Sequence, residues 1–377
     1  MHPAPTPSRA GSLLVDAELE ALSGSALRVR PGAAPITRAQ VSPASLDLRL
    51  GARAWRMRSG FLPGAGSVEA RIDELALSEL DLSRGAVLER GIPYLAEIEE
   101  ELALDPDLRA RFNPRSSTGR CDVFTRVLCA GHPRFDEAPA GYRGRLWIEI
   151  SPLSFPVRVA RGDRLAQLRL ARGNAALDAG ELQALHARTP LVYDERGPAE
   201  ALVDDEGALA LRVGLASRDP AGWRSAAHTD VVEFAVEGAH DPADFWEPVH
   251  ARGGRCILEP GSFYIFASHE RLVIPPDHAA EMLPIDVGVG ELRNNYAGFF
   301  DNGFGWSADG ATRGTPAVLE VRAHDVPFLV EDGQPFCRLR FFRTSRRPDR
   351  LYGEGRAASY RNQDLTLARC FRARGAT

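Results

Sequence analysis

Short stretches of alternating apolar and polar residues, separated by glycine, proline and aspartate, dominate the chain. Alternation with a period of two places apolar side chains on one face of an extended segment, so these stretches predict strands. The clearest are RLWIEIS (145–151), FPVRVARGDRLAQLRL (155–170), AVLEVRA (317–323) and PFCRLRFF (335–342). Helical patterns are few, with VDAELEALSG (15–24) and GELQALHART (180–189) as the best candidates. Short strands with dense turn residues are typical of barrels and sandwiches, so we predict a mainly β protein with few short helices.

The strand pattern repeats along the chain at an offset of 171 residues. SFPVRVARGDRLAQLRL (154–170) aligns without a gap on DVPFLVEDGQPFCRLRF (325–341), with matching glycines at 162 and 333. We infer two copies of one β-rich fold. A length of 377 residues suits two domains, and we place them at 1–200 and 201–377. The boundary between the two copies is expected in the acidic, turn-rich segment YDERGPAEALVDDEGA (193–208).

Composition narrows the class of protein. The hydrophobic content of 44% and charged content of 26% are typical of soluble globular proteins, and no apolar run reaches the length of a membrane span. A net charge of −5 argues against a nucleic-acid partner bound by bulk electrostatics. The N-terminus lacks the pattern of a signal peptide, and five scattered cysteines suit reduced thiols. We therefore expect a cytoplasmic protein that binds neither nucleic acid nor membrane. All 46 basic residues are arginine, so any role usually given to lysine must be filled otherwise.

Two features carry candidate chemistry. Glu149 and Glu320 stand at the same place in the two copies, each on the strand face opposite its apolar neighbours. They belong either to a solvated outer face or to a functional pocket. The stretch PRSSTGR (114–120) offers hydroxyls, a glycine and two guanidinium groups, which suit polyphosphate oxygens. It is either a phosphate-binding loop or a capped turn, and it lacks the P-loop pattern.

Five motifs in order along the chain resemble those of the deoxyuridine triphosphatase and deoxycytidine triphosphate deaminase superfamily. They are VSPASLDLRLG (41–51), PRSSTGR (114–120), FDEAPAGYRGRLWIEI (135–150), GDRLAQLRL (162–170) and ASYRNQ (358–363). The strand glutamate and the YRNQ tail point to the deaminase branch, in its tandem two-domain form. The resemblance implies two dUTPase-like β-barrel or β-clip domains.

The resemblance also implies roles for individual residues. Arg115, Ser116 and Ser117 match the family's triphosphate-binding residues, and Arg120 matches the arginine that faces the base and the catalytic carboxylate. The remaining matches are Glu149 and Glu320 to the water-activating glutamate, Asp136 (with Asp301 in the second copy) to an aspartate of the third motif, and Tyr352, Tyr360 and Gln363 to the tail. Ser359 stands where the family has a tail lysine, and Arg361 could substitute.

The second copy departs from the motifs, because Asp286, Val287 and Gly288 replace the Arg-Ser-Ser set at the offset of 171. The first copy, conversely, has no YRNQ tail. Family sites form between neighbouring domains, so we expect a homo-oligomer whose sites lie between domains. Glu149 is the first candidate for the working base, because its copy keeps the phosphate loop. Glu320 could instead meet that loop across the domain interface.

The implied activity is hydrolytic deamination of deoxycytidine triphosphate (dCTP) to deoxyuridine triphosphate (dUTP) and ammonia, a step that supplies thymidine nucleotides. Burial raises the pKa of a glutamate and makes it a better base toward water. The zinc-deaminase pattern H-x-E with P-C-x-x-C is absent, so we expect no zinc, and Mg²⁺ that arrives with the triphosphate. Alternatives are a dUTP pyrophosphatase or bifunctional enzyme using Asp136, and a non-catalytic nucleotide sensor. The sequence leaves open dTTP inhibition, the number of sites and the oligomeric state.

Overall fold

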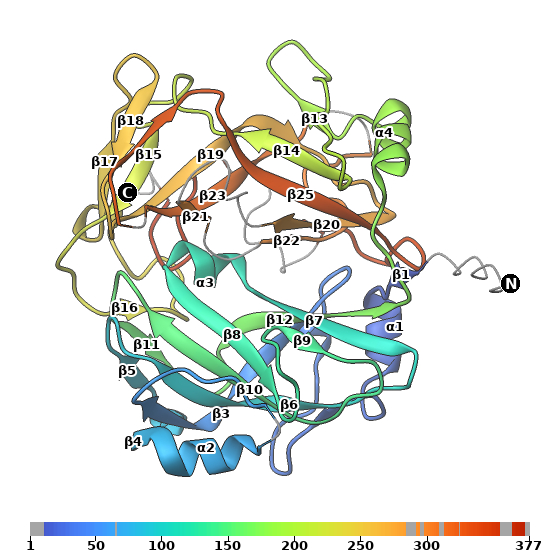
Figure 1. Ribbon diagram of the computed structural model, residues 1–377, viewed down its shortest axis with the longest axis vertical. Coiled ribbons are helices and arrows are strands. Elements are labelled where there is room, and N and C mark those ends of the chain that lie inside the picture. Colours follow the sequence, from blue (N-terminus) through green and yellow to red (C-terminus); the bar gives the residue numbers. More distant parts are fainter. Residues whose placement is uncertain are drawn as a thin grey trace, which may run out of the picture.

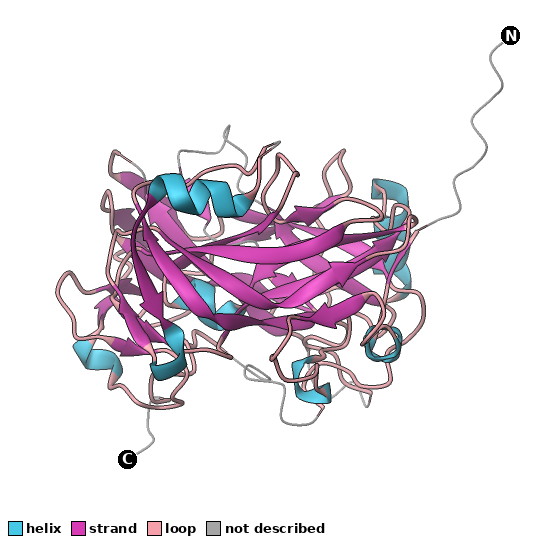
Figure 2. Cartoon of the chain, turned by 90° about the horizontal axis from the view of Figure 1, so that it is seen from below, coloured by secondary structure: helices cyan, strands magenta, loops and turns pink. Residues whose placement is uncertain are grey.

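The computed structural model describes residues 11–64, 66–283, 292–294, 298–308, 313–323, 325–354 and 364–373. Two strand-rich halves lie one on the other, and the short helix α3 lies at the seam between them (Figure 1). Strands fill the middle of the molecule, and most of the helices lie toward the outside (Figure 2). The prediction of a mainly β fold with few short helices is confirmed. No helix in the described ranges is long and apolar enough to cross a membrane.

The described residues of the first half form twelve strands. They are β1 (Ser12–Leu13), β2 (Leu27–Val29), β3 (Leu46–Met57), β4 (Ala76–Asp81), β5 (Ala86–Leu88), β6 (Tyr94–Ala103), β7 (Leu108–Pro114), β8 (Val123–Cys129), β9 (Glu137–Ala138), β10 (Arg143–Pro152), β11 (Val157–Val159) and β12 (Arg164–Arg172). Most join one sheet in the order β8-β10-β6-β3-β12-β7-β9, to which β1, β2 and β4 add at the sides. In this sheet β7 and β12 are antiparallel neighbours, which fixes the start of α3 beside β12.

The described part of the second half contains thirteen strands. They are β13 (Val192–Tyr193), β14 (Ala208–Arg212), β15 (Gly222–Ser225), β16 (Val232–Glu233), β17 (Trp246–Val249), β18 (Arg255–Leu258), β19 (Phe263–Leu272), β20 (His278–Leu283), β21 (Leu292–Asn294), β22 (Phe299–Phe300), β23 (Thr315–Ala323), β24 (Phe328–Glu331) and β25 (Pro335–Arg343). The two main sheets run β17-β15-β19-β23-β21 and β14-β25-β20-β22. A small sheet, β16-β11-β5, joins the halves, because β16 pairs with β11 of the first half.

The internal repeat is present in three dimensions. An offset of 171 residues takes β12 onto β25 with identical bounds, takes β10 onto β23, and takes β11 onto β24. Each of the four stretches predicted as strands forms strands, with 155–170 divided between β11 and β12.

The helices are α1 (Asp16–Ala21), α2 (Val68–Leu75), α3 (Ser116–Arg120) and α4 (Ala179–Arg188), with single 3-10 turns at η1 (Arg38–Gln40), η2 (Leu82–Arg84) and η3 (Pro242–Asp244). The expected helices at 15–24 and 180–189 correspond to α1 and α4. A capping box starts α4, because Asp178 accepts from Glu181 N (2.8 Å) and Glu181 accepts from Asp178 N (3.0 Å). The sequence analysis missed α2 and α3, both of which are short.

The two largest hydrophobic cores do not divide at residue 200. Leu177, Leu182, Leu185 and Leu191 belong to the second core, so α4 packs with the second half although the predicted first domain extended to residue 200. The first core also contains residues from much later in the chain, namely Trp223, Val232, Phe234, Phe245, Trp246, Phe263, Ile265, Val318, Leu367, Ala368, Cys370 and Phe371. The C-terminal segment therefore packs against the first half, near the seam.

Candidate active site

The loop that carries the Arg-Ser-Ser motif is anchored to β12. Arg115 N donates to Leu165 O (2.9 Å), and Thr118 Oγ1 donates to the same carbonyl oxygen (2.8 Å). Pro114 ends β7, and the chain then turns at once into the five residues of α3. Ser116 is exposed at the start of this helix, whereas Ser117 and Arg120 are buried. The motif is thus a helical turn held between two halves of the molecule.

Glu320 lies directly against this helical turn, across the seam. A Cβ atom added to Gly119 would stand 2.0 Å from Glu320 Oε2, so the carboxylate occupies the space that any other residue at 119 would fill. Glu320 is 8% exposed. Burial, with a further contribution from Asp122, raises the pKa of Glu320 well above its ordinary value, and the charge of Arg120 partly opposes this. The second half therefore supplies a buried, proton-binding carboxylate to the loop of the first half.

An ion pair holds the same junction. Asp122, fully buried just after α3, pairs with Arg322 Nη2 and accepts from Ser154 Oγ (2.6 Å). Arg322 follows Glu320 by two residues on β23, so period-two alternation puts both on one strand face. Sequence reasoning missed Asp122 and Arg322, although this alternation was a signal for the arginine.

The C-terminal segment closes the other side of Arg120. Arg120 Nη1 donates to Thr366 O (2.8 Å), and the thiols of Cys121 and Cys370 lie 3.7 Å apart. Phe371 anchors the segment by packing on Phe155, Phe245 and Trp246 in the first core. Thr366 had no signal in the sequence, because it contributes a backbone carbonyl. The aromatic residues Phe245 and Trp246 are core residues.

Glu149, the preferred base in the sequence analysis, lies in different surroundings. It is buried like Glu320, so a solvated outer face is wrong for both residues. However, Glu149 pairs with Arg126 of the neighbouring strand β8 (2.6 Å), and Arg126 lies over the ring of Phe135 (3.8 Å). A Cβ atom on Gly60 would stand 2.5 Å from Glu149 Oε2, so the chain's own loop covers this carboxylate. The described structure brings Glu320, and not Glu149, to Arg120.

Asp136 of the third motif is half-buried, its counterpart Asp301 is buried, and both accept hydrogen bonds from backbone N–H groups. Asp136 accepts from Val127 N (2.8 Å), and burial raises its pKa to about 7. Its counterpart Asp301 accepts from Ala44 N (2.9 Å) in the first motif of the other half, and burial raises its pKa to about 7 as well. Asp136 therefore lies within the first half, whereas Asp301 ties the second half to the first.

The other predicted site residues divide between the phosphate loop and the tail. Arg115 is held by Asp47, with 3.0 Å between Nε and Oδ1. Tyr352 donates its backbone N–H to Asn302 O (2.8 Å) and its ring lies 5.5 Å from that of Phe304. Tyr360 and Gln363, with Ser359 and Arg361, lie outside the described residues, as do the replaced positions Asp286, Val287 and Gly288. In the parts of the chain described, no three His, Cys, Asp or Glu side chains form a metal-binding group.

Both halves of the chain match domains of one known protein family. Residues 12–174 match the N-terminal domain of 2'-deoxycytidine 5'-triphosphate deaminase, and residues 178–371 match the C-terminal domain of the same family. The chain belongs to the dCTP deaminase family. The crystal structure of the 2'-deoxycytidine 5'-triphosphate deaminase from Agrobacterium tumefaciens is similar over 90% of this chain and 100% of that one, with a TM-score of 0.82 and 44% identity. The composite arrangement of Arg120 and Glu320 therefore occurs in a tandem dCTP deaminase fold.

Curated dCTP deaminases match a smaller part of the chain. The proteins named dCTP deaminase from Halorubrum lacusprofundi and Natronomonas pharaonis are 33% and 30% identical over 134 and 132 residues, 34% of this chain in each case. A protein from Beutenbergia cavernae, named "dCTP deaminase, dUMP-forming", is 31% identical over 101 residues, or 26% of this chain. The matches span 62%, 65% and 48% of those relatives' lengths, which is less than two thirds of each.

Proposed function

We propose that the chain deaminates dCTP hydrolytically to dUTP and ammonia, with Glu320 as the base that activates water. The observation that carries the proposal is the position of Glu320 against Gly119 and Arg120, at the meeting of two halves that belong to the dCTP deaminase family. A carboxylate with a raised pKa is the better acceptor for a proton from water at neutral pH. This choice replaces Glu149, whose carboxylate is engaged by Arg126 and covered by Gly60.

The proposed step moves one water across C4 of the cytosine ring. The water oxygen bonds to C4 while Glu320 takes one proton from the water and passes it to N3. Glu320 then takes the second proton from the new C4 hydroxyl and passes it to the leaving amino group. The C4–N bond then breaks, ammonia leaves and the C4 carbonyl of uracil forms. Arg120, steadied by Thr366 O, balances the charge that develops during the attack. The step needs no group beyond water and the residues of this chain.

Arg115, Ser116 and Ser117 are proposed to hold the triphosphate. Guanidinium and hydroxyl groups at the start of α3 are suitable donors to phosphate oxygens. The nearby carboxylate of Asp47 is shared between Arg115 (3.0 Å) and Arg164 (3.5 Å). We therefore propose that Mg²⁺ comes with the triphosphate and neutralises its charge without dedicated protein ligands. No zinc is invoked, and deamination is expected to persist under zinc-specific chelation with Mg²⁺ in excess.

A second candidate is the bifunctional reaction that continues to dUMP. The name of the Beutenbergia cavernae relative, dUMP-forming, favours testing it. The nonenzymatic alternative, a nucleotide sensor, predicts binding without turnover. We also propose that the chain is cytoplasmic and forms a homo-oligomer. Light scattering on the purified chain gives the mass of the assembly and so tests the oligomer.

One assay separates these functions. The purified chain is incubated with dCTP and Mg²⁺, the nucleotides are separated by chromatography and ammonia is quantified. Deamination yields dUTP and ammonia in equal amounts, and the bifunctional reaction yields dUMP, pyrophosphate and ammonia. Nucleotide binding with no ammonia release would contradict the deaminase proposal and favour the sensor.

A further inference from the structure

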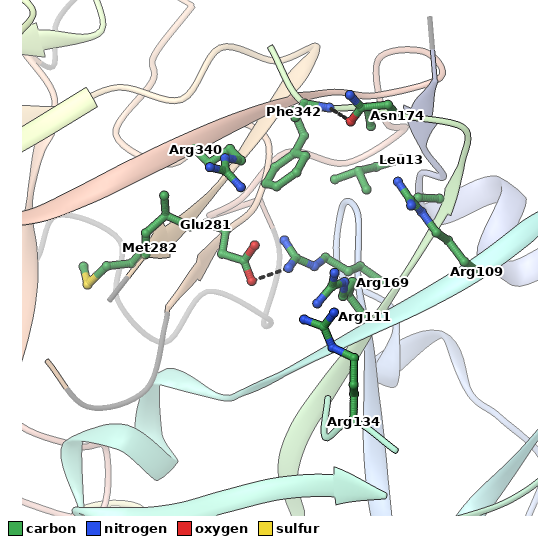
Figure 3. Close-up of a pocket in the computed structure, with 14 residues that line it drawn as sticks. Leu13, Arg109, Arg111, Arg134, Arg169, Asn174, Glu281, Met282, Arg340 and Phe342 are labelled. Carbon is green, nitrogen blue, oxygen red and sulfur yellow. Dashed lines mark hydrogen bonds and ion pairs between the residues drawn. The ribbon is translucent and has the colours of Figure 1, made fainter. Parts of the chain in front are cut away.

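A cavity of about 550 Å³ lies between the two halves, apart from the site at Arg120 and Glu320. Strands β7 and β12 of the first half form one side, and β20 and β25 of the second half form the other (Figure 3). None of the described residues that line it belongs to α3 or β23. The volume is in the range of about 300–1,000 Å³ that is usual for small-molecule sites.

Five arginines from both halves line the cavity: Arg109, Arg111, Arg134, Arg169 and Arg340. Figure 3 shows Arg111 and Arg134 pointing upward toward Arg169, while Arg340 enters from β25 on the opposite side. Among the lining residues described, Glu281 is the one carboxylate.

The carboxylates near the arginines do not balance them. Glu281 already pairs with Arg169 and accepts from Asn113 Nδ2 (2.9 Å). Glu137, outside the lining, is shared by Arg111 (3.1 Å) and Arg134 (3.7 Å), and Glu206, also outside it, lies 3.9 Å from Arg340 Nη2, so three carboxylates stand against five arginines. The cavity is therefore a concentrated positive region in a chain whose net charge is −5.

Arg169 gives the second, independent indication of a ligand. Its side chain is 4% exposed and is held between the rings of Phe299 and Phe342, whose centroids lie 4.8 and 5.2 Å from Cζ. Among the described residues, Nη2 pairs with Glu281, while the buried Nε and Nη1 have no hydrogen-bond partner in this part of the chain. Buried polar groups are normally satisfied, so two open donors on a fixed guanidinium indicate an acceptor that is brought by a bound molecule.

The rest of the lining is apolar. Leu13, Met282 and Phe342 face the same cavity as the arginines. Phosphate oxygens suit the guanidinium donors, and a planar base suits the apolar side. We propose that this cavity binds a nucleoside triphosphate, with its phosphates on the arginines, at a place separate from the deamination site. The proposal does not depend on which reaction the chain catalyses.

The test is calorimetric titration of the whole chain with ATP and, separately, with inorganic tripolyphosphate, at low salt. Arg109 and Arg340 are the variants of choice, because Arg109 is exposed and Arg340 half-buried, so Arg109→Gln/Arg340→Gln preserves the fold. The double variant should raise the Kd for ATP at least about tenfold for each arginine lost, because a hydrogen bond from a charged group changes a binding constant by about that factor or more. Arg172→Gln, on the same strand as Arg169 but outside the cavity and paired with Asp107, is the matched control and should bind as the unaltered chain.

Arg115→Gln separates the cavity from the phosphate loop. The proposal requires ATP binding that survives Arg115→Gln and is lost in Arg109→Gln/Arg340→Gln. Binding that is unchanged in the double variant, or lost in Arg115→Gln alone, would overturn it. Tripolyphosphate that binds more tightly than ATP would also overturn the nucleotide assignment, because the apolar side would then contribute nothing.

Discussion

The exchange of Glu320 for glutamine tests the proposed chemistry most directly. Glutamine keeps the size of the side chain above Gly119 but cannot take a proton from water. Removal of a positioned general base lowers turnover by about 10²- to 10⁴-fold, so Glu320→Gln should lose at least two orders of magnitude in kcat. KM should change little, because the phosphate loop on α3 is untouched.

The same substitution should stabilise the protein. Burial raises the pKa of Glu320 well above its ordinary value, so the folded chain holds that proton more tightly than the unfolded chain does. Such a group stabilises the fold below the unfolded pKa, near 4.3, and this contribution is lost as the pH rises through the folded pKa. Glutamine is neutral throughout, so the free energy of unfolding of Glu320→Gln should exceed that of the unaltered chain increasingly as the pH rises from about 4 to neutral.

Glu149→Gln is the matched control, since this residue has the same place in the other copy. Its salt bridge to Arg126, which is 31% exposed, contributes on the order of 1 kcal/mol, so the variant should lose a little stability and keep dCTP turnover within a few-fold. Ammonia release at several pH values and urea unfolding at the same values give both readouts. Full turnover in Glu320→Gln, with turnover lost in Glu149→Gln, would refute the assignment. Lost turnover accompanied by lower stability in Glu320→Gln would show that the carboxylate is structural.

Three further substitutions test other contacts. Gly119→Ala places a methyl group 2.0 Å from Glu320 Oε2 and should lower turnover at least about tenfold in the ammonia assay. The control Gly60→Ala places its methyl group 2.5 Å from Glu149 Oε2 and should leave turnover near normal. The raised pKa of Asp301 means that its ionisation destabilises the fold as the pH rises from about 4 to about 7. Asp301→Asn removes this ionisation, so its free energy of unfolding should fall less over this range than that of the unaltered chain. Urea unfolding that gives parallel pH dependences for the two proteins would contradict this prediction. Phe371→Ala should lower the free energy of unfolding by about 3–5 kcal/mol and raise KM, because the C-terminal segment loses its anchor. Leu329→Ala, at a side chain that is 48% exposed, is the control and should change the free energy of unfolding by no more than about 0.5 kcal/mol. Equal effects of the two substitutions would refute the role of Phe371 as the anchor.

Many strands of this fold could be predicted from the sequence, because the alternation of apolar and polar residues that marks a strand is visible within a few neighbouring positions. The stretch at 335–342 forms β25 and the stretch at 317–323 forms β23, since each alternates with the period of a half-buried strand. The offset of 171 residues was readable for the same reason. The helix α4 was found by its periodicity, but its leucines gave no indication of which core they enter. The domain boundary at residue 200 stays a prediction.

The site was predictable as a set of residues but not as an arrangement. The motif at 114–120 identified the loop, and the repeated glutamates identified two candidate bases. The choice between them depends on packing across the seam, where Gly119 leaves room for one carboxylate. Residues that act through the backbone, such as Thr366, leave no mark in a sequence pattern.

Each copy supplies a different part of the junction at α3. The first copy keeps the arginines and serines at α3, while the second has Asp286, Val287 and Gly288 at the corresponding positions. Among the described residues, the glutamate that lies against Gly119 is Glu320 of the second copy. Glu149 of the first copy is instead paired with Arg126 within its own half, which offsets the cost of burying its charge. The Asp122–Arg322 pair joins the two halves beside α3, so contacts within one chain hold Glu320 close to Arg120.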